Sequence, residues 1–302
     1  MSKIAFIFPG QGAQYVGMGK DFYDTYEEAK AVYRKAGEVT GLNMEELCFT
    51  ENENLNITKY TQIAMLATEV ALLKVLESKG VHADVCAGLS LGEYGALAAA
   101  GVMDLDSLFH IIRQRGIYMQ EAYPVGGVMT AVLGLDAAVI EEVLKQIDGL
   151  VSIANYNCPG QIVITGEAKA VEAAGAALQT AGAKRCIPLK VSGPFHSQML
   201  KGAGEKLGVE LENVEFNDPE IPYLNNVAAE IVTTKDSIKE TLERQVYSPV
   251  RWEQCVNKMI EEGVDLFYEI GPGKTLAGFM KRIDRSKKVI TINTVEDLEG
   301  VN

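Results

Sequence analysis

One serine and one histidine in this sequence have surroundings that suit nucleophilic catalysis. Ser90 is the centre of the motif GLSLG at 88–92, between a predicted strand and a predicted helix. A sharp strand-to-helix turn strains its central residue and exposes that side chain, and glycines at Gly88 and Gly92 avoid clashes with the adjacent backbone. The motif therefore predicts a serine nucleophile, and an ordinary turn before a helix is the alternative.

A serine hydroxyl needs a base to remove its proton, and the base is most often histidine. The chain has three histidines. His82 precedes the strand that leads to GLSLG and His110 lies in an apolar helical run, so both are interpreted as structural. His196 follows a turn at 192–194 and precedes a helical stretch, where a helix N-terminus disfavours the charged imidazolium. We predict that His196 is the base; a capping or surface histidine is the alternative.

The sequence gives weaker signals for the oxyanion donors and for the group that orients the histidine. The helix after Ser90 directs free N–H groups at the turn, so the backbone N–H of Leu91 is the natural first donor to an oxyanion. No motif marks a third, acidic residue, and a main-chain carbonyl could orient the histidine instead. A general base contributes about 10²–10⁴-fold and one oxyanion donor about 10²–10³-fold, so useful rates require both.

These residues need a scaffold of alternating strands and helices. The pattern predicts strands at 3–8 and 84–87 and helices at 61–79 and 93–100, which is typical of a parallel sheet. The first strand stops at Pro9, and the glycine-rich turn 10–12 then leads to a long helical stretch.

A smaller unit interrupts this alternation. Strands are predicted at 128–133, 151–154, 161–165 and 184–189, with helices at 137–147 and 169–181. This βαββαβ order is that of a ferredoxin-like unit, so we predict an inserted subdomain at 126–190 and a main domain at 1–125 and 191–302. Later strands at 221–225, 266–270 and 289–292 return to the main sheet, and the polar tail 296–302 is predicted to fray.

Composition excludes several classes of protein. The net charge of −13 repels nucleic acid, and the richest apolar stretches are interrupted by Glu69 and Glu93, so no membrane span is predicted. The five cysteines form no CxxC pair and are odd in number, which disfavours a disulfide framework and a zinc site. With no export signal at the start, a cytoplasmic location is expected.

Short motifs are distributed over nearly the whole chain. They are FPGQGAQ at 8–14, GLSLGEY at 88–94, QRG at 114–116, NYNCPGQ at 155–161, GPFH at 193–196, RQVYSPV at 244–250 and EIGPGK at 269–274. In these motifs and their order the sequence resembles malonyl-CoA:acyl carrier protein transacylases of fatty acid synthesis. The resemblance implies an α/β-hydrolase-like main domain with a parallel sheet and a ferredoxin-like insert.

The resemblance also implies roles for individual residues. Ser90 would carry the acyl group and His196 would be its base, oriented by the main-chain carbonyl of Gln245. The backbone N–H groups of Gln11 and Leu91 would form the oxyanion hole.

Two further positions concern the substrate. By the same resemblance Arg115 would hold the malonyl carboxylate and Asn157 would line the site. Arg113 should face elsewhere on the helix. Malonyl-CoA and acyl carrier protein are the implied partners, with no cofactor and no metal.

The sequence departs from the family pattern at Leu89, where many relatives have histidine. Alternatives for the function are a serine thioesterase or hydrolase, a polyketide-type acyltransferase, and a binding module without activity. The cationic run 281–288 is a candidate docking surface for an acidic carrier protein, although a solvated surface is the simpler interpretation.

Overall fold

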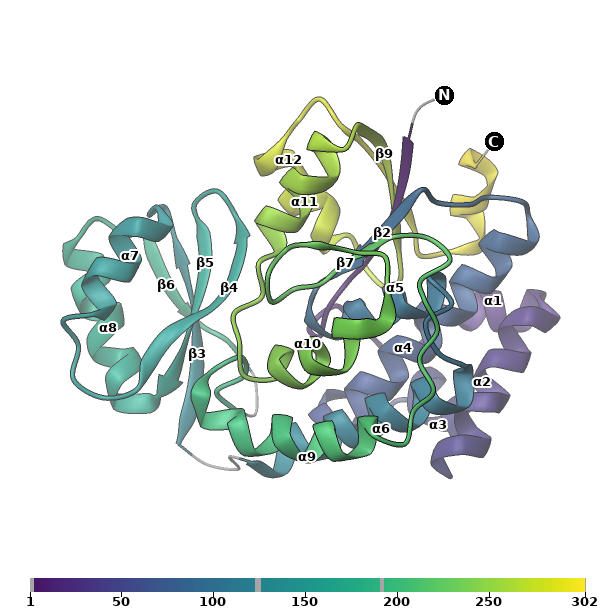
Figure 1. Cartoon of the computed structure of the whole chain (residues 1–302), viewed down its shortest axis with the longest axis horizontal. Helices are drawn as coiled ribbons and strands as arrows, with labels where there is room; N and C mark the ends of the chain where they lie inside the picture. Colours follow the sequence, from purple (N-terminus) through teal and green to yellow (C-terminus); the bar gives the residue numbers. More distant parts are fainter. Residues whose placement is uncertain (1–2, 123–125, 191–192, 302) are drawn as a thin grey trace.

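The structure is a computed structural model that describes residues 3–122, 126–190 and 193–301. Two sheets organise the chain, as Figure 1 shows: a six-stranded sheet in the larger part, on the right, and a four-stranded sheet on the left. Both ends of the chain lie in the larger part. The fold is therefore mixed α/β, as predicted.

The larger sheet has the strand order β10-β9-β1-β2-β7-β8. All its neighbouring strands are parallel except β7 and β8, which are antiparallel. Five predicted strands are confirmed with small shifts of their ends: β1 (Lys3–Phe8), β2 (Val85–Gly88), β7 (Tyr223–Leu224), β9 (Val264–Ile270) and β10 (Lys288–Ile292). The short strand β8 (Ile231–Val232) was not predicted.

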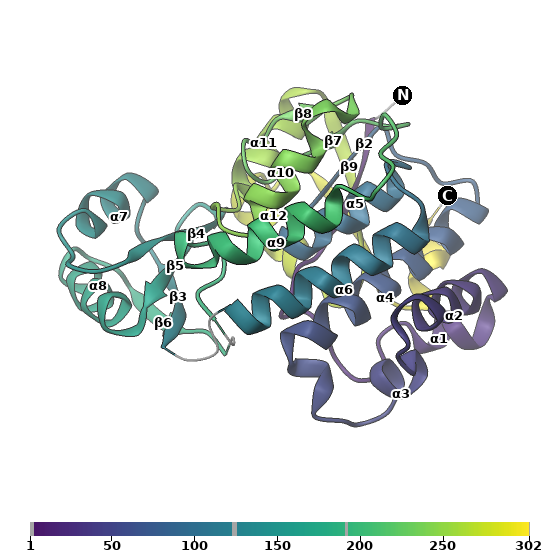
Figure 2. The same cartoon turned by 60° about the horizontal axis from the view of Figure 1, so that its bottom comes forward.

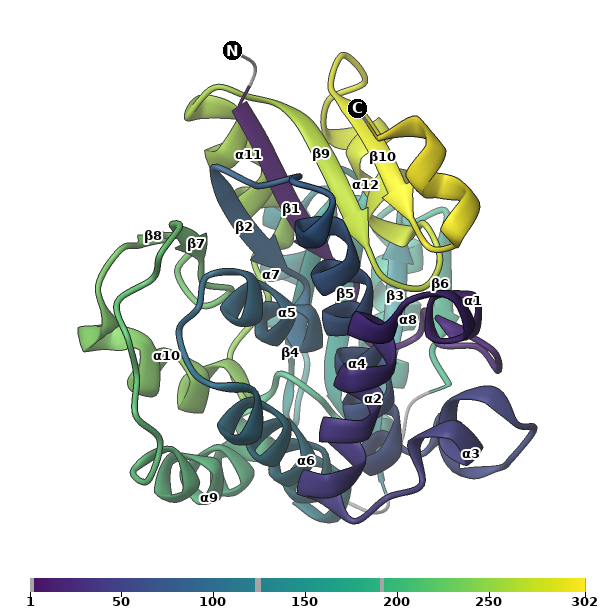
Figure 3. The same ribbon diagram turned by 90° about the vertical axis from the view of Figure 1, so that its right-hand side faces the viewer.

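Helices cover both faces of this sheet because alternate strand residues point to opposite sides. In β1, Phe6 and Phe8 pack against the helices of one face, and Ala5 and Ile7 pack against those of the other. The first face carries α2 (Glu27–Thr40), α4 (Thr58–Ser78), α5 (Glu93–Ala99) and α6 (Leu105–Ala122), and the second carries α11 (Trp252–Glu261) and α12 (Thr275–Ile283) (Figure 3).

The smaller sheet is antiparallel, with the order β4-β5-β3-β6. Its elements are β3 (Gly127–Leu133), α7 (Ala137–Leu144), β4 (Val151–Cys158), β5 (Gln161–Glu167), α8 (Ala168–Thr180) and β6 (Arg185–Pro188). One face packs against α7 and α8, whereas Met129 and Val163 on the other face belong to the core shared with the larger part. Backbone hydrogen bonds from Tyr156 to Val250 and from Val250 to Ala154 tie β4 to the larger part.

The remaining helices are short or lie on the surface. They are α1 (Lys20–Thr25), α3 (Met44–Phe49), η1 (Asn54–Asn56), η2 (Ser90–Gly92), η3 (Gln198–Leu200), α9 (Lys201–Leu211), η4 (Lys235–Ser237), α10 (Ile238–Gln245) and η5 (Val295–Gly300). Figure 2 shows α9 lying along α6. No helix in the described ranges combines the length and apolar composition required to cross a bilayer.

Two expectations about the ends of the chain are wrong. The helical stretch predicted directly after residues 10–12 starts only at Lys20, because the intervening loop turns at several glycines. The tail does not fray as predicted: η5 begins with a capping box formed by Thr294 and Asp297, and the Val295 N–H donates to Asp21 at 2.6 Å. These polar contacts hold the segment together with buried Leu298 and with Val295 and Val301, which pack against the core.

The central helix α4 contains a buried carboxyl group. Glu69 has no exposed surface, and neither carboxyl oxygen has a hydrogen-bond partner among the described residues. Glycines make room for it, since a Cβ added at Gly95 would lie 2.8 Å from its Oε2. Burial raises the pKa of Glu69 well above its usual value, which favours the protonated form in the native state.

We expect Glu69→Met to increase the free energy of unfolding at pH 7 by about 1–3 kcal/mol, the usual cost of a buried unsatisfied polar group. An acid whose pKa is raised in the native state destabilises that state increasingly as pH rises above the pKa in the unfolded chain. The stability gained by Glu69→Met should therefore shrink as pH falls towards 4.5. Urea unfolding at both pH values measures this, with Glu77→Met on the more exposed end of α4 as the control. Equal stability of Glu69→Met and the native chain at pH 7 would contradict the expectation.

Candidate active site

The ends of three neighbouring strands bring distant loops together. Phe8 of β1 pairs with Gly88 of β2, so the loop at 9–12 and the turn at 88–92 leave the sheet side by side. Leu224 of β7 pairs with Ala87 of β2, which places the following Asn226 next to the same turn. The carboxyl ends of parallel strands are the usual place for a site in such a sheet.

The turn at Ser90 has the strained geometry predicted from GLSLG. Ser90 has a φ of 55°, in the left-handed region. A Cβ added at Gly88 would come 1.9 Å from the backbone of Gly92, and one at Gly92 would come 2.2 Å from the Phe8 carbonyl oxygen. Larger residues cannot occupy these two positions, so the glycines make the turn possible.

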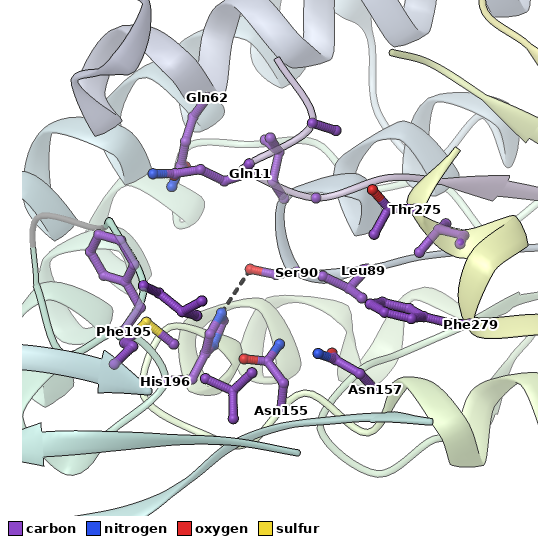
Figure 4. Close-up of a pocket in the computed structure, with 18 of the residues that line it drawn as sticks. Gln11, Gln62, Leu89, Ser90, Asn155, Asn157, Phe195, His196, Thr275 and Phe279 are labelled. Carbon is purple, nitrogen blue, oxygen red and sulfur yellow. Dashed lines mark hydrogen bonds between the residues drawn. The ribbon is translucent and has the colours of Figure 1, made fainter. Parts of the chain in front are cut away.

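Ser90 and His196 are in direct contact. The distance from Ser90 Oγ to His196 Nε2 is 2.7 Å, as the dashed line in Figure 4 shows. On the opposite side of the ring, His196 Nδ1 is 2.8 Å from the main-chain carbonyl oxygen of Gln245. A carbonyl can only accept, so Nδ1 carries the proton and Nε2 presents a lone pair to the serine hydroxyl. This tautomer is the one that can take the proton of Ser90.

The environment of His196 keeps its ring neutral. Burial, and next the positive charge of Arg115, lower the pKa of His196 to about 4, against the opposing effect of the backbone contacts with Gln245 and Ser248. The predicted cause was a helix start. Helix η3 does begin at Gln198, where the sequence predicted a helical stretch, but burial and not the helix start is the main effect on the pKa of His196.

Arg115 on α6 lies directly behind the nucleophile. Its Nη2 donates to Ser90 Oγ at 3.2 Å and to Gln245 Oε1 at 2.9 Å, and its Nη1 donates to Gln62 Oε1 at 2.8 Å. The side chain is 1% exposed. These partners are all uncharged, and no carboxylate within residues 3–122, 126–190 and 193–301 forms an ion pair with Arg115. The buried carboxyl of Glu93 acts on this guanidinium through its charge but forms no ion pair with it in the described part of the chain. A buried guanidinium without a direct ion-pair partner beside a nucleophile is suited to an anionic substrate.

A buried polar network that the sequence did not reveal supports the turn. Asn226 accepts from the Ser90 N–H at 2.6 Å and donates to the Gly88 carbonyl at 2.7 Å. The Gln245 side chain donates to the Ser90 carbonyl at 2.9 Å, and Glu93 accepts from Gln245 at 2.7 Å and from the Asn226 N–H at 3.0 Å. Burial raises the pKa of Glu93 to about 7. The network fixes both backbone sides of Ser90.

A cavity of about 230 Å³ opens over Ser90. In Figure 4 the Ser90 hydroxyl points at the His196 ring, and Asn157 and Phe279 lie towards one end of the cavity. Its lining also includes Gly10, Gln11, Gly12, Ala13, Gln62, Leu89, Leu91, Met119, Met129, Asn155, Val163, Leu189, Phe195, Thr275 and Leu276. Most of these side chains are apolar or neutral, so the cavity offers an acyl chain a weakly polar surface.

The structure gathers the predicted residues in one place. Gln11, Leu91 and Asn157 line the cavity with the Ser90–His196 pair, whereas Arg115 and Gln245 contact that pair from behind. Asn157 Oδ1 is buried and has no partner in the described part of the chain. Leu89 forms part of the apolar wall of the cavity.

The alternatives among the basic residues lie elsewhere. His82 is exposed, and exposed His110 contacts Glu210 at 3.1 Å. Arg113 faces away from the site, as predicted, and donates to the Lys59 carbonyl. Of the three histidines, only His196 lines the cavity.

Comparison with known proteins agrees with this geometry. The profile of the acyl transferase domain family matches residues 5–296. The chain belongs to the acyl transferase domain family. Among curated proteins, this acyl transferase domain is 46% identical over 304 residues to the malonyl CoA-acyl carrier protein transacylase of Bacillus subtilis strain 168, covering 99% of this chain and 96% of that protein.

Solved structures give the same result. The domain matches an acyl carrier protein S-malonyltransferase of Vibrio cholerae with a TM-score of 0.97, 43% identity and complete coverage of both chains. It also matches a malonyl-transacylase solved in complex with a type II polyketide acyl carrier protein, with a TM-score of 0.96, 41% identity and coverage of 99% and 98%. The acyl transferase domain therefore has full-length relatives of known fold.

The cationic run 281–288 covers the end of α12 and the start of β10. Lys287 in this run forms an ion pair with Asp265 at 2.8 Å, and Arg285 donates to the Lys281 carbonyl. Docking of a carrier protein on this run stays a prediction.

Proposed function

We propose that this enzyme transfers a malonyl group from malonyl-CoA to the phosphopantetheine thiol of acyl carrier protein, and so supplies fatty acid synthesis. The observation that carries the proposal is the buried guanidinium of Arg115, which has no ion-pair partner among the described residues and lies 3.2 Å from Ser90 Oγ. A bidentate contact with the free malonyl carboxylate would neutralise that charge beside the nucleophile. The relatives named for this reaction support the same substrate.

In the first half-reaction, Ser90 Oγ attacks the thioester carbonyl carbon while His196 Nε2 takes the hydroxyl proton. The carbonyl oxygen becomes an oxyanion, which the N–H groups of Gln11 and Leu91 would stabilise. Collapse of this intermediate breaks the carbon–sulfur bond, and the departing CoA sulfur takes the proton from His196. A malonyl ester of Ser90 remains.

The second half-reaction reverses these steps with another thiol. His196 takes the proton of the pantetheine thiol, and the sulfur attacks the ester carbonyl. The bond between Ser90 Oγ and the malonyl carbonyl carbon breaks, and Ser90 Oγ recovers its proton from His196. The Gln245 carbonyl would hold the ring in one orientation throughout, and Asn157 would contact the bound acyl group. CoA is itself a substrate in the proposed reaction, so no cofactor is needed. None of the steps above requires a metal.

We also propose a finer classification of the fold. Residues 1–125 and 191–302 would form an α/β-hydrolase-like domain, and residues 126–190 a ferredoxin-like insert. The βαββαβ order of the insert and its strand order β4-β5-β3-β6 favour this assignment. Residues 123–125 and 191–192, beside these boundaries, lie outside the described residues.

The substrate assignment can be tested with a panel of donors and the variant Arg115→Ala. We expect the native enzyme to convert malonyl-CoA and pantetheine to malonyl-pantetheine, measured by mass spectrometry of the products. Arg115→Ala should lower malonyl transfer by about ten- to a hundredfold, the effect of a charge-assisted hydrogen bond worth about 1.5–3 kcal/mol. Transfer of acetyl groups, which lack the carboxylate, should rise relative to malonyl.

Arg113→Ala, on the same helix but facing away, is the control and should keep the malonyl preference. Free malonate as the main product in the presence of thiol would instead indicate a thioesterase. An unchanged malonyl-to-acetyl ratio in Arg115→Ala would refute the role of Arg115.

A further inference from the structure

Glu93 of α5 is a fully buried carboxyl group that no step of the proposed reaction uses. Its Oε2 accepts from the Gln245 side chain at 2.7 Å and from the Asn226 N–H at 3.0 Å. Its Oε1 is buried and has no partner among the described residues. An ionised carboxylate with one oxygen left bare in the interior is unfavourable, and a proton removes the charge. The bare oxygen is therefore the place where Glu93 can bind a proton.

One amide group links Glu93 to the guanidinium beside the nucleophile. Gln245 Oε1 accepts from Arg115 Nη2 at 2.9 Å, and Gln245 Nε2 donates to Glu93 Oε2. The negative end of the amide dipole therefore faces the cation, and its positive end faces the carboxyl group. The charges of Glu93 and Arg115 also act on each other directly, although the two groups form no ion pair in the described part of the chain. Glu93 is thus placed to balance the charge of Arg115.

The other titratable groups around Glu93 are neutral at neutral pH. Burial raises the pKa of three groups that sense its charge: Tyr94 of α5, Tyr223 of β7 and Cys255 of α11. Glu69 of α4 packs against α5 at Gly95, but burial alone raises its pKa. His196, with a pKa lowered to about 4, is neutral as well. Burial raises the pKa of Glu93 itself to about 7, against its two hydrogen bonds and the charge of Arg115.

This charge balance changes when a carboxylate enters the site. In the proposed function the malonyl carboxylate pairs with Arg115, which neutralises the cation that favours ionised Glu93 and brings a second anion into the same buried region. Two like charges that share a buried site favour protonation of one of them. We propose that Glu93 takes up a proton from the solvent at Oε1 when the malonyl carboxylate binds to Arg115, an inference that rests on the proposed function. The substrate's anion then replaces the protein's own.

This exchange makes malonyl binding depend on pH. Below pH 7 Glu93 already carries its proton, so malonyl-CoA binds without any further uptake. Above pH 7 the proton must come from the solution, and the affinity for malonyl-CoA should fall by up to about tenfold for each pH unit. Acetyl-CoA lacks the carboxylate, so its affinity should not fall in this way.

Proton uptake can be measured directly by titration calorimetry in two buffers that differ in ionisation enthalpy. The protein is Ser90→Ala, which cannot form the ester but keeps the backbone groups that the network contacts. At pH 7.5 we expect malonyl-CoA to bind with uptake of up to about 0.8 proton, the ionised share of a group with a pKa of about 7. Acetyl-CoA carries the same phosphates and should bind with no comparable uptake.

The double variant Ser90→Ala, Glu93→Gln tests whether Glu93 binds that proton. A glutamine oxygen can accept from both Gln245 and Asn226, and its amide nitrogen takes the place of the bare Oε1. This variant should bind malonyl-CoA without proton uptake and, at pH 8, about tenfold more tightly than Ser90→Ala. Glu69→Gln in the Ser90→Ala background is the matched control, because it removes a buried carboxyl outside the network and should keep the uptake.

Two results would overturn the proposal: equal proton uptake with malonyl-CoA and acetyl-CoA, or uptake that persists in the Glu93→Gln variant. If Glu93→Gln does not fold, the comparison of the two ligands on Ser90→Ala still decides. Binding of malonyl-CoA without uptake refutes the role of Glu93 and leaves the proposed function intact. If malonyl-CoA neither binds to Ser90→Ala nor acylates the native enzyme, the proposed function itself fails, and this inference fails with it.

Discussion

The variant Ser90→Ala should form no covalent malonyl adduct, and its transfer rate should fall by about 10⁶-fold, as expected when a nucleophile that acts as a unit with its base is removed. The structure gives the physical reason. Ser90 Oγ is the hydroxyl 2.7 Å from the unprotonated nitrogen of His196, and it faces the cavity. Intact-protein mass spectrometry after brief incubation with malonyl-CoA measures the adduct directly.

Ser78→Ala is the matched control, because this serine only caps the end of α4 through the Val75 carbonyl. It should be labelled like the native chain. A malonyl adduct on Ser90→Ala would place the acyl group on another residue and would rule out the proposed nucleophile.

The variant His196→Ala should lower the rate of Ser90 acylation by about 10²–10⁴-fold, the usual contribution of a general base. His196 must be neutral to accept a proton. Because its pKa is lowered to about 4, mainly by burial, the acylation rate of the native enzyme should be lost only as pH falls through about 4. Rapid-quench measurements of adduct formation across this range test both statements.

His82→Ala removes an exposed histidine and should leave the rate and the pH profile unchanged. An acid limb near the ordinary histidine value of 6.5 would mean that the ring is more solvated than its burial indicates. Unchanged acylation in His196→Ala would exclude it as the base.

Features that are set by residues close together in the sequence could be predicted from local patterns. The turn at GLSLG could be predicted because the two glycines that permit it lie within two residues of Ser90. The strand and helix order followed from apolar spacing, and the alternation of elements was enough to predict a parallel sheet.

Contacts between residues far apart in the chain could not be predicted in this way. Asn226 lies 136 residues from Ser90, and only the pairing of β7 with β2 brings its side chain to the Ser90 N–H. Asn226, directly after the predicted strand 221–225, was the available signal. The roles of Arg115 and Gln245 came from resemblance to a family, because no spacing rule relates a buried arginine on a helix to a nucleophile on a turn.

The hydrogen-bond acceptor for His196 Nδ1 belongs to the peptide chain and not to a side chain. Every amino acid at position 245 supplies that carbonyl, so no substitution there can remove it. Replacing the peptide bond after residue 245 by an ester would weaken the carbonyl as a hydrogen-bond acceptor. The side chain at the same position holds Arg115 at 2.9 Å. The same side chain also donates to the Ser90 carbonyl and to Glu93. A substitution at Gln245 therefore keeps the acceptor of the His196 ring but removes contacts that position Arg115 and the turn at Ser90.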